Sequence, residues 1–334
     1  MINIGVIGYG YWGPNLVRNF CKTEGCSVTH VADLNEKRLK TLVQQYPFIE
    51  TTTSSDDLIN NPKIDAVIIA TPAYTHFQLA KKALLSGKHV IVEKPMTTLG
   101  KEAEELIALA QKNETILMPD HTYLYTSAVK IISDIVKQGI LGEIQYIDSV
   151  RINLGLFQSD INVLWDLAPH DLAICSILLK ERPIAVQATG ISHTNNNIEN
   201  IGYLTLFYPS NKIAHLTCSW TSPVKVRHML IGGDKKMIVF NDLETTEKIK
   251  VYDSGYKLTS EIEKNNILVD YRVGDILVPK VPIKEALEAM AEDFVAAVNK
   301  KKNPLSDHNI GLEIVQILEA AQKSIKQRGK EIYL

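Results

Sequence analysis

The pattern of apolar and polar residues differs between the two parts of the chain. Up to about residue 120, short apolar runs alternate with stretches of helical periodicity. The apolar runs predict buried strands at residues 2–7, 28–32, 66–70, 90–93 and 116–118. The periodic stretches predict helices at residues 16–21, 36–46, 76–86 and 101–112. Strands that alternate with helices form a parallel sheet covered on both faces, so we expect an α/β domain over residues 1–120.

Beyond residue 120, strands follow one another with few helices between them. Helices are predicted at residues 127–137 and 171–179, before the strands begin. The strand-like runs are residues 185–190, 203–208, 214–219, 228–232, 237–240 and 249–252. Two amphipathic helices follow, at residues 282–300 and 311–328. This order is typical of a large, mostly antiparallel open sheet, and it predicts an α+β domain over residues 121–334.

Composition narrows the class of protein. At about 150 residues per domain, 334 residues suggest two domains. Thirty-six basic and 38 acidic residues give a net charge of -2, which argues against nucleic-acid and membrane partners. Four cysteines without a Cys-x-x-Cys pair exclude a disulfide scaffold and a zinc ribbon, and they favour a reducing, cytoplasmic location. We expect neither a signal peptide nor a transmembrane helix.

A Gly-x-Gly-x-x-Gly motif at residues 8–13 directly follows the first predicted strand. In this setting Gly8 permits a tight turn, Gly10 lets the backbone approach a pyrophosphate, and Gly13 lets helix and strand pack closely. The helix N-terminus then offers free N–H groups to phosphates. Asp33 ends the next strand, 20 residues after Gly13, where a carboxylate binds the adenine ribose. The alternative is a glycine turn in an α/β protein that binds no ligand. The strand before the motif, the helix after it and the acid at residue 33 together argue against that alternative.

The choice of dinucleotide depends on residues near Asp33. Its carboxylate would accept hydrogen bonds from ribose hydroxyls and repel a 2′-phosphate, which favours NAD over NADP. Arg38 leaves NADP open, although a solvent-facing helix arginine is the favoured interpretation over a phosphate contact. Leu34 is expected beside the ribose. Within the motif, Tyr9 is expected to bind the cofactor. Tyr11 and Trp12 are expected to pack beside the pyrophosphate turn, with apolar packing inside the domain as their alternative.

Three further segments carry a family resemblance. They are Ala-Thr-Pro-Ala-Tyr-Thr-His at 70–76, Glu-Lys-Pro at 93–95, and Trp-Asp-Leu-Ala-Pro-His-Asp-Leu at 165–172. With the glycine motif, they resemble the glucose-fructose oxidoreductase, inositol dehydrogenase and rhizopine-catabolism oxidoreductase (Gfo/Idh/MocA) family over nearly the whole chain. Residues 121–125 and 151–155 resemble its sugar-nucleotide branch.

The resemblance implies a Rossmann domain followed by a substrate-binding and oligomerisation domain on an open, largely antiparallel sheet. It implies an NAD-dependent oxidoreductase that moves a hydride between nicotinamide and a ring secondary alcohol or ketone of a sugar. A nucleotide sugar in polysaccharide biosynthesis, reacting at C3, is the favoured substrate. The resemblance also implies a homodimer or homotetramer.

The resemblance assigns catalysis to Lys94, Asp166 and His170. The matching lysine contacts the nicotinamide ribose and a substrate hydroxyl, where a fixed ammonium favours oxyanion character. Histidine suits proton transfer because its pKa lies near the working pH, so we expect His170 to act as acid or base. Asp166, four residues earlier, would hold a substrate hydroxyl or orient the imidazole. The alternatives are a solvent-facing lysine and a helix-start histidine, with Asp171 as a helix N-terminal carboxylate.

Other residues are expected around the same centre. The cofactor would be flanked by Thr71, Pro72, His76, Glu93, Lys94 and Pro95. The substrate would be contacted by Lys94, Tyr123, Arg151, Asp166 and His170. Packing is an equal alternative for Tyr123, and a strand-edge position is one for Arg151. No metal is expected, because no nearby cysteine or histidine completes a ligand set with Asp166 and His170.

Three rival functions remain. A non-catalytic dinucleotide-sensing protein would share the fold, although the combination of Lys94, Asp166 and His170 argues against it. A cyclitol dehydrogenase or an NAD-using glycosidase would share the residues as well. Net NADH release distinguishes a dehydrogenase from a glycosidase.

Overall fold

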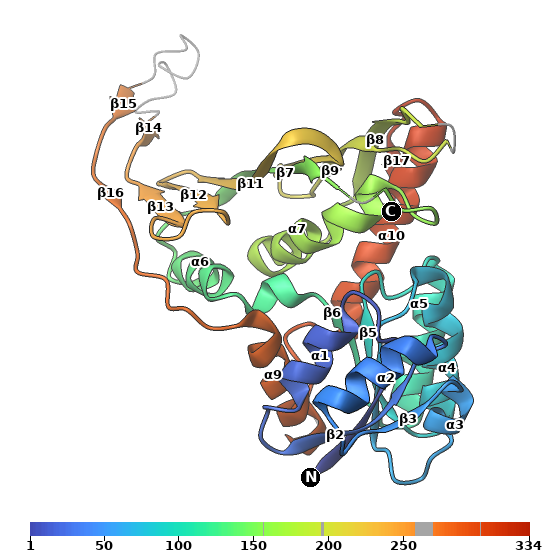
Figure 1. The fold of residues 1–334 in the computed structure, drawn as a ribbon. Helices are drawn as coiled ribbons and strands as arrows, with labels where there is room; N and C mark the ends of the chain where they lie inside the picture. The colour runs from blue at the N-terminus through green and yellow to red at the C-terminus, as the bar shows by residue number, and fades with distance from the viewer. Residues whose placement is uncertain (156, 195–196, 258–269, 301) are drawn as a thin grey trace. The chain divides into compact units, whose positions relative to one another are not determined.

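The computed structural model describes residues 1–155, 157–194, 197–257, 270–300 and 302–334 (Figure 1). By its internal contacts the chain divides into two compact units. Unit 1 comprises Met1–Thr126 and Lys284–Glu319, and unit 2 comprises Ser127–Ile283 and Ala320–Leu334. The domain boundary after residue 120 stays a prediction. The division by contacts differs from it in assigning residues 284–319 to unit 1.

Unit 1 is built on a six-stranded sheet in which all strands are parallel. Its spatial order is β3 (Glu50–Thr52), β2 (Cys26–Ala32), β1 (Ile2–Ile7), β4 (Ala66–Ile69), β5 (His89–Glu93) and β6 (Leu117–Asp120). The predicted parallel sheet is confirmed. The direction of strand succession reverses between β1 and β4, and ligands of open α/β sheets bind beyond the carboxyl ends of the strands at such a switch point.

Helices connect these strands and pack beside the sheet. They are α1 (Gly13–Phe20), α2 (Glu36–Gln45), α3 (Ser55–Ile59), α4 (His76–Leu85) and α5 (Gly100–Lys112), with short 3₁₀ turns η1 (Ala73–Thr75) and η2 (Thr122–Tyr125). A late segment, α9 (Ala286–Lys300), lies against α1 (Figure 1). Phe294 of α9 meets Phe20 edge-to-face, with ring centroids 6.2 Å apart. Both rings are fully buried in the same core as the strand residues, so α9 completes unit 1.

Unit 2 is built on a nine-stranded sheet. Its order is β16 (Ile276–Leu277), β13 (Ile249–Tyr252), β12 (Met237–Asn241), β11 (Thr221–Gly233), β7 (Ile144–Leu154), β10 (Ile213–Ser219), β9 (Ile201–Phe207), β8 (Ala185–Ile191) and β17 (Ile332–Tyr333). Every pair is antiparallel except β7 with β10. The predicted open, mostly antiparallel sheet is therefore confirmed. A separate hairpin pairs β14 (Gly255–Lys257) with β15 (Asp270–Arg272).

The helices of unit 2 are α6 (Ser127–Lys137) and α7 (Val163–Leu179), and α7 packs on strands β7, β9 and β10. Helix α10 (His308–Lys326) belongs to unit 1 as far as Glu319 and to unit 2 from Ala320. The prediction that α7 begins at residue 171 was wrong by eight residues. Asn162 caps the helix, because its Oδ1 accepts the N–H groups of Leu164 and Trp165, and Pro169 lies inside it.

Candidate active site

The glycine turn after β1 is required by packing at two of its three glycines. Gly8 has a φ of +97°, and a side-chain Cβ there would lie 2.4 Å from the Ala70 carbonyl oxygen. A Cβ on Gly13 would lie 2.3 Å from the Gly8 carbonyl oxygen. At Gly10 the nearest atom is Arg38 Nη1, at 3.7 Å. The protein itself leaves room at Gly10, so glycine there is explained by the close approach of a ligand.

Asp33 is fixed against this turn. Its Oδ2 accepts the Tyr9 N–H at 2.6 Å, and its Oδ1 accepts the Asn35 N–H at 2.7 Å. Arg38 Nη1 lies 3.5 Å from Oδ2, and the Asp33 side chain is only 6% exposed. Helix α1 carries no acidic residue in its first turn to compete with a phosphate. The carboxylate and the helix start thus flank the turn as dinucleotide binding requires.

A shallow hollow of about 560 Å³ begins at Asp33. Its lining consists of Asp33, Leu34, Asn35, Glu36, Lys37, Arg38 and Lys40. Leu34, Tyr11 and Trp12 are exposed, whereas Tyr9 is buried. Packing inside the domain therefore accounts for Tyr9 and for neither Tyr11 nor Trp12.

His76 joins two loops at the carboxyl edge of the sheet. This residue is 1% exposed, and its Nδ1 and Nε2 lie 2.8 Å from the carbonyl oxygens of Pro95 and Thr71, respectively. Each ring nitrogen therefore lies within hydrogen-bond distance of a backbone carbonyl oxygen, one in each loop. Pro95 follows a cis peptide bond from Lys94, and Pro72 caps η1. The loops after β4 and β5 are thereby tied together beside the predicted nicotinamide position.

Two acids and a histidine that the sequence analysis did not single out as a group lie close enough to Lys94 for its charge to shift the pKa of each. Glu93 ends β5, Asp120 ends β6, and the two are register partners. Burial raises the pKa of Glu93 well above its ordinary value, and the neighbouring Asp120 raises it further. Burial lowers the pKa of His121 to about 3, so this imidazole is neutral at pH 7. Among the described residues, neither His121 ring nitrogen has a hydrogen-bond partner.

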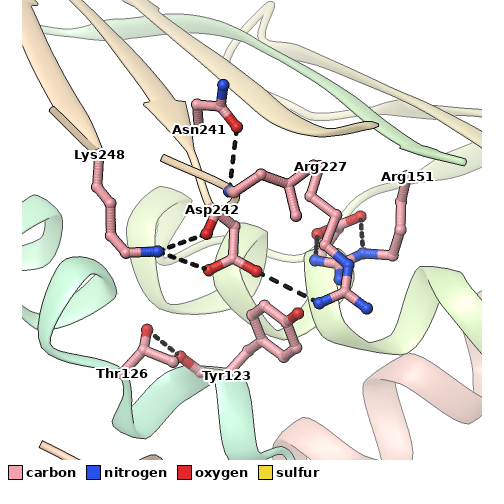
Figure 2. A network of polar contacts seen from close by, with 9 residues as sticks. Tyr123, Thr126, Arg151, Arg227, Asn241, Asp242 and Lys248 are labelled. Atoms are coloured by element: carbon pink, nitrogen blue, oxygen red, sulfur yellow. Dashed lines mark hydrogen bonds and ion pairs between the residues drawn. The ribbon is translucent and has the colours of Figure 1, made fainter. Parts of the chain in front are cut away.

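Tyr123 lies in η2, two residues after His121. Its side chain is half-buried, and its carbonyl oxygen accepts the Thr126 hydroxyl at 2.9 Å (Figure 2). A substrate contact by its hydroxyl stays a prediction.

In unit 2, Asp166 and His170 lie four residues apart on α7 and are both half-buried. Trp220 Nε1–H donates to Asp166 Oδ2 at 2.9 Å. Because the segment is helical, the two side chains share one face, as the sequence spacing required.

Arg151 lies on the central strand β7 rather than at a sheet edge. Its Nε and Nη2 donate to the two Asp171 carboxylate oxygens at 3.0 and 2.6 Å. The side chains of both residues are almost fully buried. The expectation that Asp171 starts a helix was wrong, because α7 begins eight residues earlier. A substrate contact by Arg151 stays a prediction, and it would have to compete with this ion pair.

A second set of charges lies next to this ion pair (Figure 2). Arg227 on β11 is the register partner of Arg151. Asp242 lies between two cations, with its carboxylate oxygens 3.4 Å from Arg227 Nη1 and 3.6 Å from Lys248 Nζ. Sequence reasoning missed this set, because strand register alone brings residues 15 positions apart together.

Comparison with known proteins identifies the family. Residues 2–121 match the GFO_IDH_MocA family, described as "Oxidoreductase family, NAD-binding Rossmann fold", and residues 129–239 match the GFO/IDH/MocA C-terminal domain. The chain belongs to the Gfo/Idh/MocA family. As a member, it is an NAD-binding oxidoreductase, and the open turn at Gly10 with Asp33 beside it fits that cofactor.

Relatives in the family cover nearly the whole chain. The uncharacterized oxidoreductase YdgJ of Escherichia coli is 24% identical over 98% of this chain and 97% of its own. UDP-N-acetylglucosamine 3-dehydrogenase of Acidithiobacillus ferrooxidans is 26% identical over 93% of both chains.

Solved structures share the fold of this chain. A structure of the A. ferrooxidans enzyme has a TM-score of 0.80 at 24% identity, covering 97% of this chain and 99% of that chain. GenD2 from gentamicin A biosynthesis, in complex with NAD, has a TM-score of 0.83 at 18% identity, covering 100% and 96%. Among the described residues, no helix is long and apolar enough to cross a membrane, and no cluster of three metal-ligating side chains occurs.

Proposed function

We propose that this protein transfers a hydride between NAD and a ring secondary alcohol or ketone of a nucleotide sugar, at C3. The observation that carries the proposal is the glycine turn with its fixed Asp33, in a sheet whose carboxyl edge also carries Lys94. The similarity to a UDP-N-acetylglucosamine 3-dehydrogenase over 93% of both chains supports the substrate class. We also propose a cytoplasmic homodimer or homotetramer, on the family resemblance.

The proposal assigns a separate role to each of three residues, Lys94, His170 and Asp166. The bound nicotinamide supplies the hydride acceptor. The Lys94 ammonium binds the reacting oxygen and stabilises its developing negative charge. His170 accepts the hydroxyl proton as the carbon–oxygen double bond forms, and it returns the proton in the reverse reaction. Asp166, held by Trp220, binds a substrate hydroxyl or orients the imidazole.

NADH absorbance tests the proposal directly. Purified protein with NAD is offered UDP-N-acetylglucosamine, other nucleotide sugars, free sugars and inositols, and NADH formation is followed. We expect turnover with a nucleotide sugar. Lys94→Ala and His170→Ala should each lower kcat by about 10²–10⁴-fold while NAD binding by calorimetry persists.

Lys81→Ala is the matched control, because Lys81 makes an ion pair with Glu105 that is substantially exposed, and it should keep normal turnover. Normal turnover in both Lys94→Ala and His170→Ala would overturn the site assignment. A wild-type protein that binds NAD but oxidises no sugar would overturn the proposed function in favour of dinucleotide sensing.

An NAD-using glycosidase is the second candidate. A glycosyl hydrolase family 109 protein of Shewanella is 29% identical over 161 residues, which is 46% of this chain. Such an enzyme would release sugar from a glycoside without net NADH. Hydrolysis without NADH accumulation would therefore replace the dehydrogenase with the glycosidase.

A further inference from the structure

Two carboxyl groups meet at the carboxyl ends of adjacent strands in unit 1. Glu93 on β5 and Asp120 on β6 are register partners, and neighbouring strands lie about 4.8 Å apart. The two residues are only 7% and 2% exposed. Such a pair cannot hold two negative charges without a large cost in free energy, because two buried like charges at this separation repel each other and are poorly solvated.

The hydrogen bonds around the pair indicate where a proton lies. Asp120 Oδ1 accepts the Thr122 hydroxyl, and Glu93 Oε2 accepts the Lys94 N–H at 3.2 Å. Asp120 Oδ2 is buried and has no hydrogen-bond partner in the described part of the chain. The two carboxyl groups are close enough for each to shift the other's pKa, so a proton on Glu93 would supply the donor that Asp120 Oδ2 lacks.

The surrounding charges favour the same arrangement. Burial raises the pKa of both carboxyls, whereas hydrogen bonds from Thr122 and Glu93 lower the pKa of Asp120. The positive charge of the Lys94 ammonium lowers the pKa of both acids. His121 is neutral, and the Tyr125 hydroxyl donates to Asp293 at 2.9 Å, so neither ring adds a charge. Asp293 has Lys302 3.6 Å away as its own cation.

We propose that Glu93 and Asp120 share one proton, and that the single negative charge of this pair positions the Lys94 ammonium and retains its proton. Asp120 is the ionised member and Glu93 the protonated one. Both are positioning residues, because they act through Lys94. The inference rests on the proposed function, since it gives the catalytic Lys94 its counter-ion.

Isosteric amides provide the test. Either Glu93→Gln or Asp120→Asn leaves one carboxyl and one hydrogen-bond donor, so each single variant still carries one negative charge. The double variant E93Q/D120N carries none. We expect the alkaline limb of the kcat profile, which reports loss of the Lys94 proton, to stay in place in both single variants. In the double variant it should move to lower pH by about one unit or more, because an ammonium without a nearby anion loses its proton more easily.

Two outcomes would overturn the inference. One is a double variant whose alkaline limb coincides with that of the wild type. The other is a shift of the alkaline limb in both single variants, because two independently ionised carboxylates would each contribute a part of the whole shift. Urea unfolding of each variant shows whether the protein under assay is folded, and Thr122→Ser preserves the hydroxyl donor as a control.

An infrared measurement separates this inference from the proposed function. The wild type with NAD and no sugar should show the carbonyl stretch of a protonated carboxyl at pH 7, and Glu93→Gln should remove it. A wild type that turns over no sugar would overturn the proposed function. The infrared band would still be observed in that protein if the two carboxyls share a proton. Absence of the band overturns the shared proton even in an active enzyme.

Discussion

Buried charges are arranged differently at the carboxyl edge of the parallel sheet and in the middle of the antiparallel sheet. At the first, Glu93 and Asp120 place two acids together beside Lys94, and His121 has no hydrogen-bond partner among the described residues. In the second, Arg151 and Asp171 match opposite charges one to one. The first arrangement makes protonation states responsive to neighbours, as functional sites require, whereas the second fixes geometry.

The largest expected effect comes from breaking the matched pair. Arg151→Met leaves the Asp171 carboxylate buried without its cation and should lower the free energy of unfolding by about 3–5 kcal/mol. Urea denaturation measures this loss. The double variant Arg151→Met/Asp171→Leu should recover most of it, because no buried charge is left unpaired. A loss below 1 kcal/mol in the single variant would contradict a structural role for the pair.

The glycine turn separates packing from ligand binding within unit 1. Gly13→Ala forces a Cβ to 2.3 Å from the Gly8 carbonyl oxygen and should cost about 1–3 kcal/mol of stability. Gly10→Ala meets only Arg38 Nη1, at an ordinary contact distance of 3.7 Å, so stability should change little while NAD affinity falls about tenfold or more. Calorimetry with NAD and urea unfolding check both variants. Equal losses of stability in the two would show that Gly10 is a packing residue.

The carboxyl pair should appear in the pH dependence of stability. The raised pKa of Glu93 means that, above the ordinary glutamate pKa, the folded state binds more protons than the unfolded state. Wild-type stability therefore falls as the pH rises through this window, and Glu93→Gln removes that contribution. Unfolding at several pH values should show a gain for Glu93→Gln that grows by up to about 1.4 kcal/mol per pH unit. A gain that shrinks with pH would be inconsistent with a raised pKa.

The smallest effect is expected for an exposed pair in unit 1. Lys82 and Asp56 form an ion pair at 2.7 Å with more than half of each side chain exposed. Lys82→Ala should change the free energy of unfolding by less than about 1 kcal/mol, because solvent screens the pair. A larger loss by urea denaturation would contradict the view that burial of an ion pair decides its contribution to stability.

Sequence periodicity predicted both sheets, because alternation of strands with helices and succession of strands are local signals. It missed β7, although that strand lies at the centre of unit 2 and carries Arg151. It also missed the early start of α7, since Pro169 lies inside that helix.

The site divides in the same way. The turn from Gly8 to Gly13 and Asp33 follow a spacing that is written in the chain. The meeting of Glu93 with Asp120 depends on strand register across 27 positions, and the pairing of Arg151 with Asp171 depends on how α7 packs on β7. An acid that ends a buried strand, as Asp120 ends β6, is a signal that could have pointed to the carboxyl pair.

The late arrival of α9 has a consequence for biosynthesis. Phe294 covers Phe20, and Ser306 donates its hydroxyl to the Pro119 carbonyl oxygen, so the first 126 residues lack part of their own interior. A ribosome must translate beyond residue 300 before this nucleotide-binding unit can be completed by α9. Until then, the apolar surface of α1 that α9 covers is exposed on the nascent chain. Chaperones recognise exposed apolar surfaces of this kind.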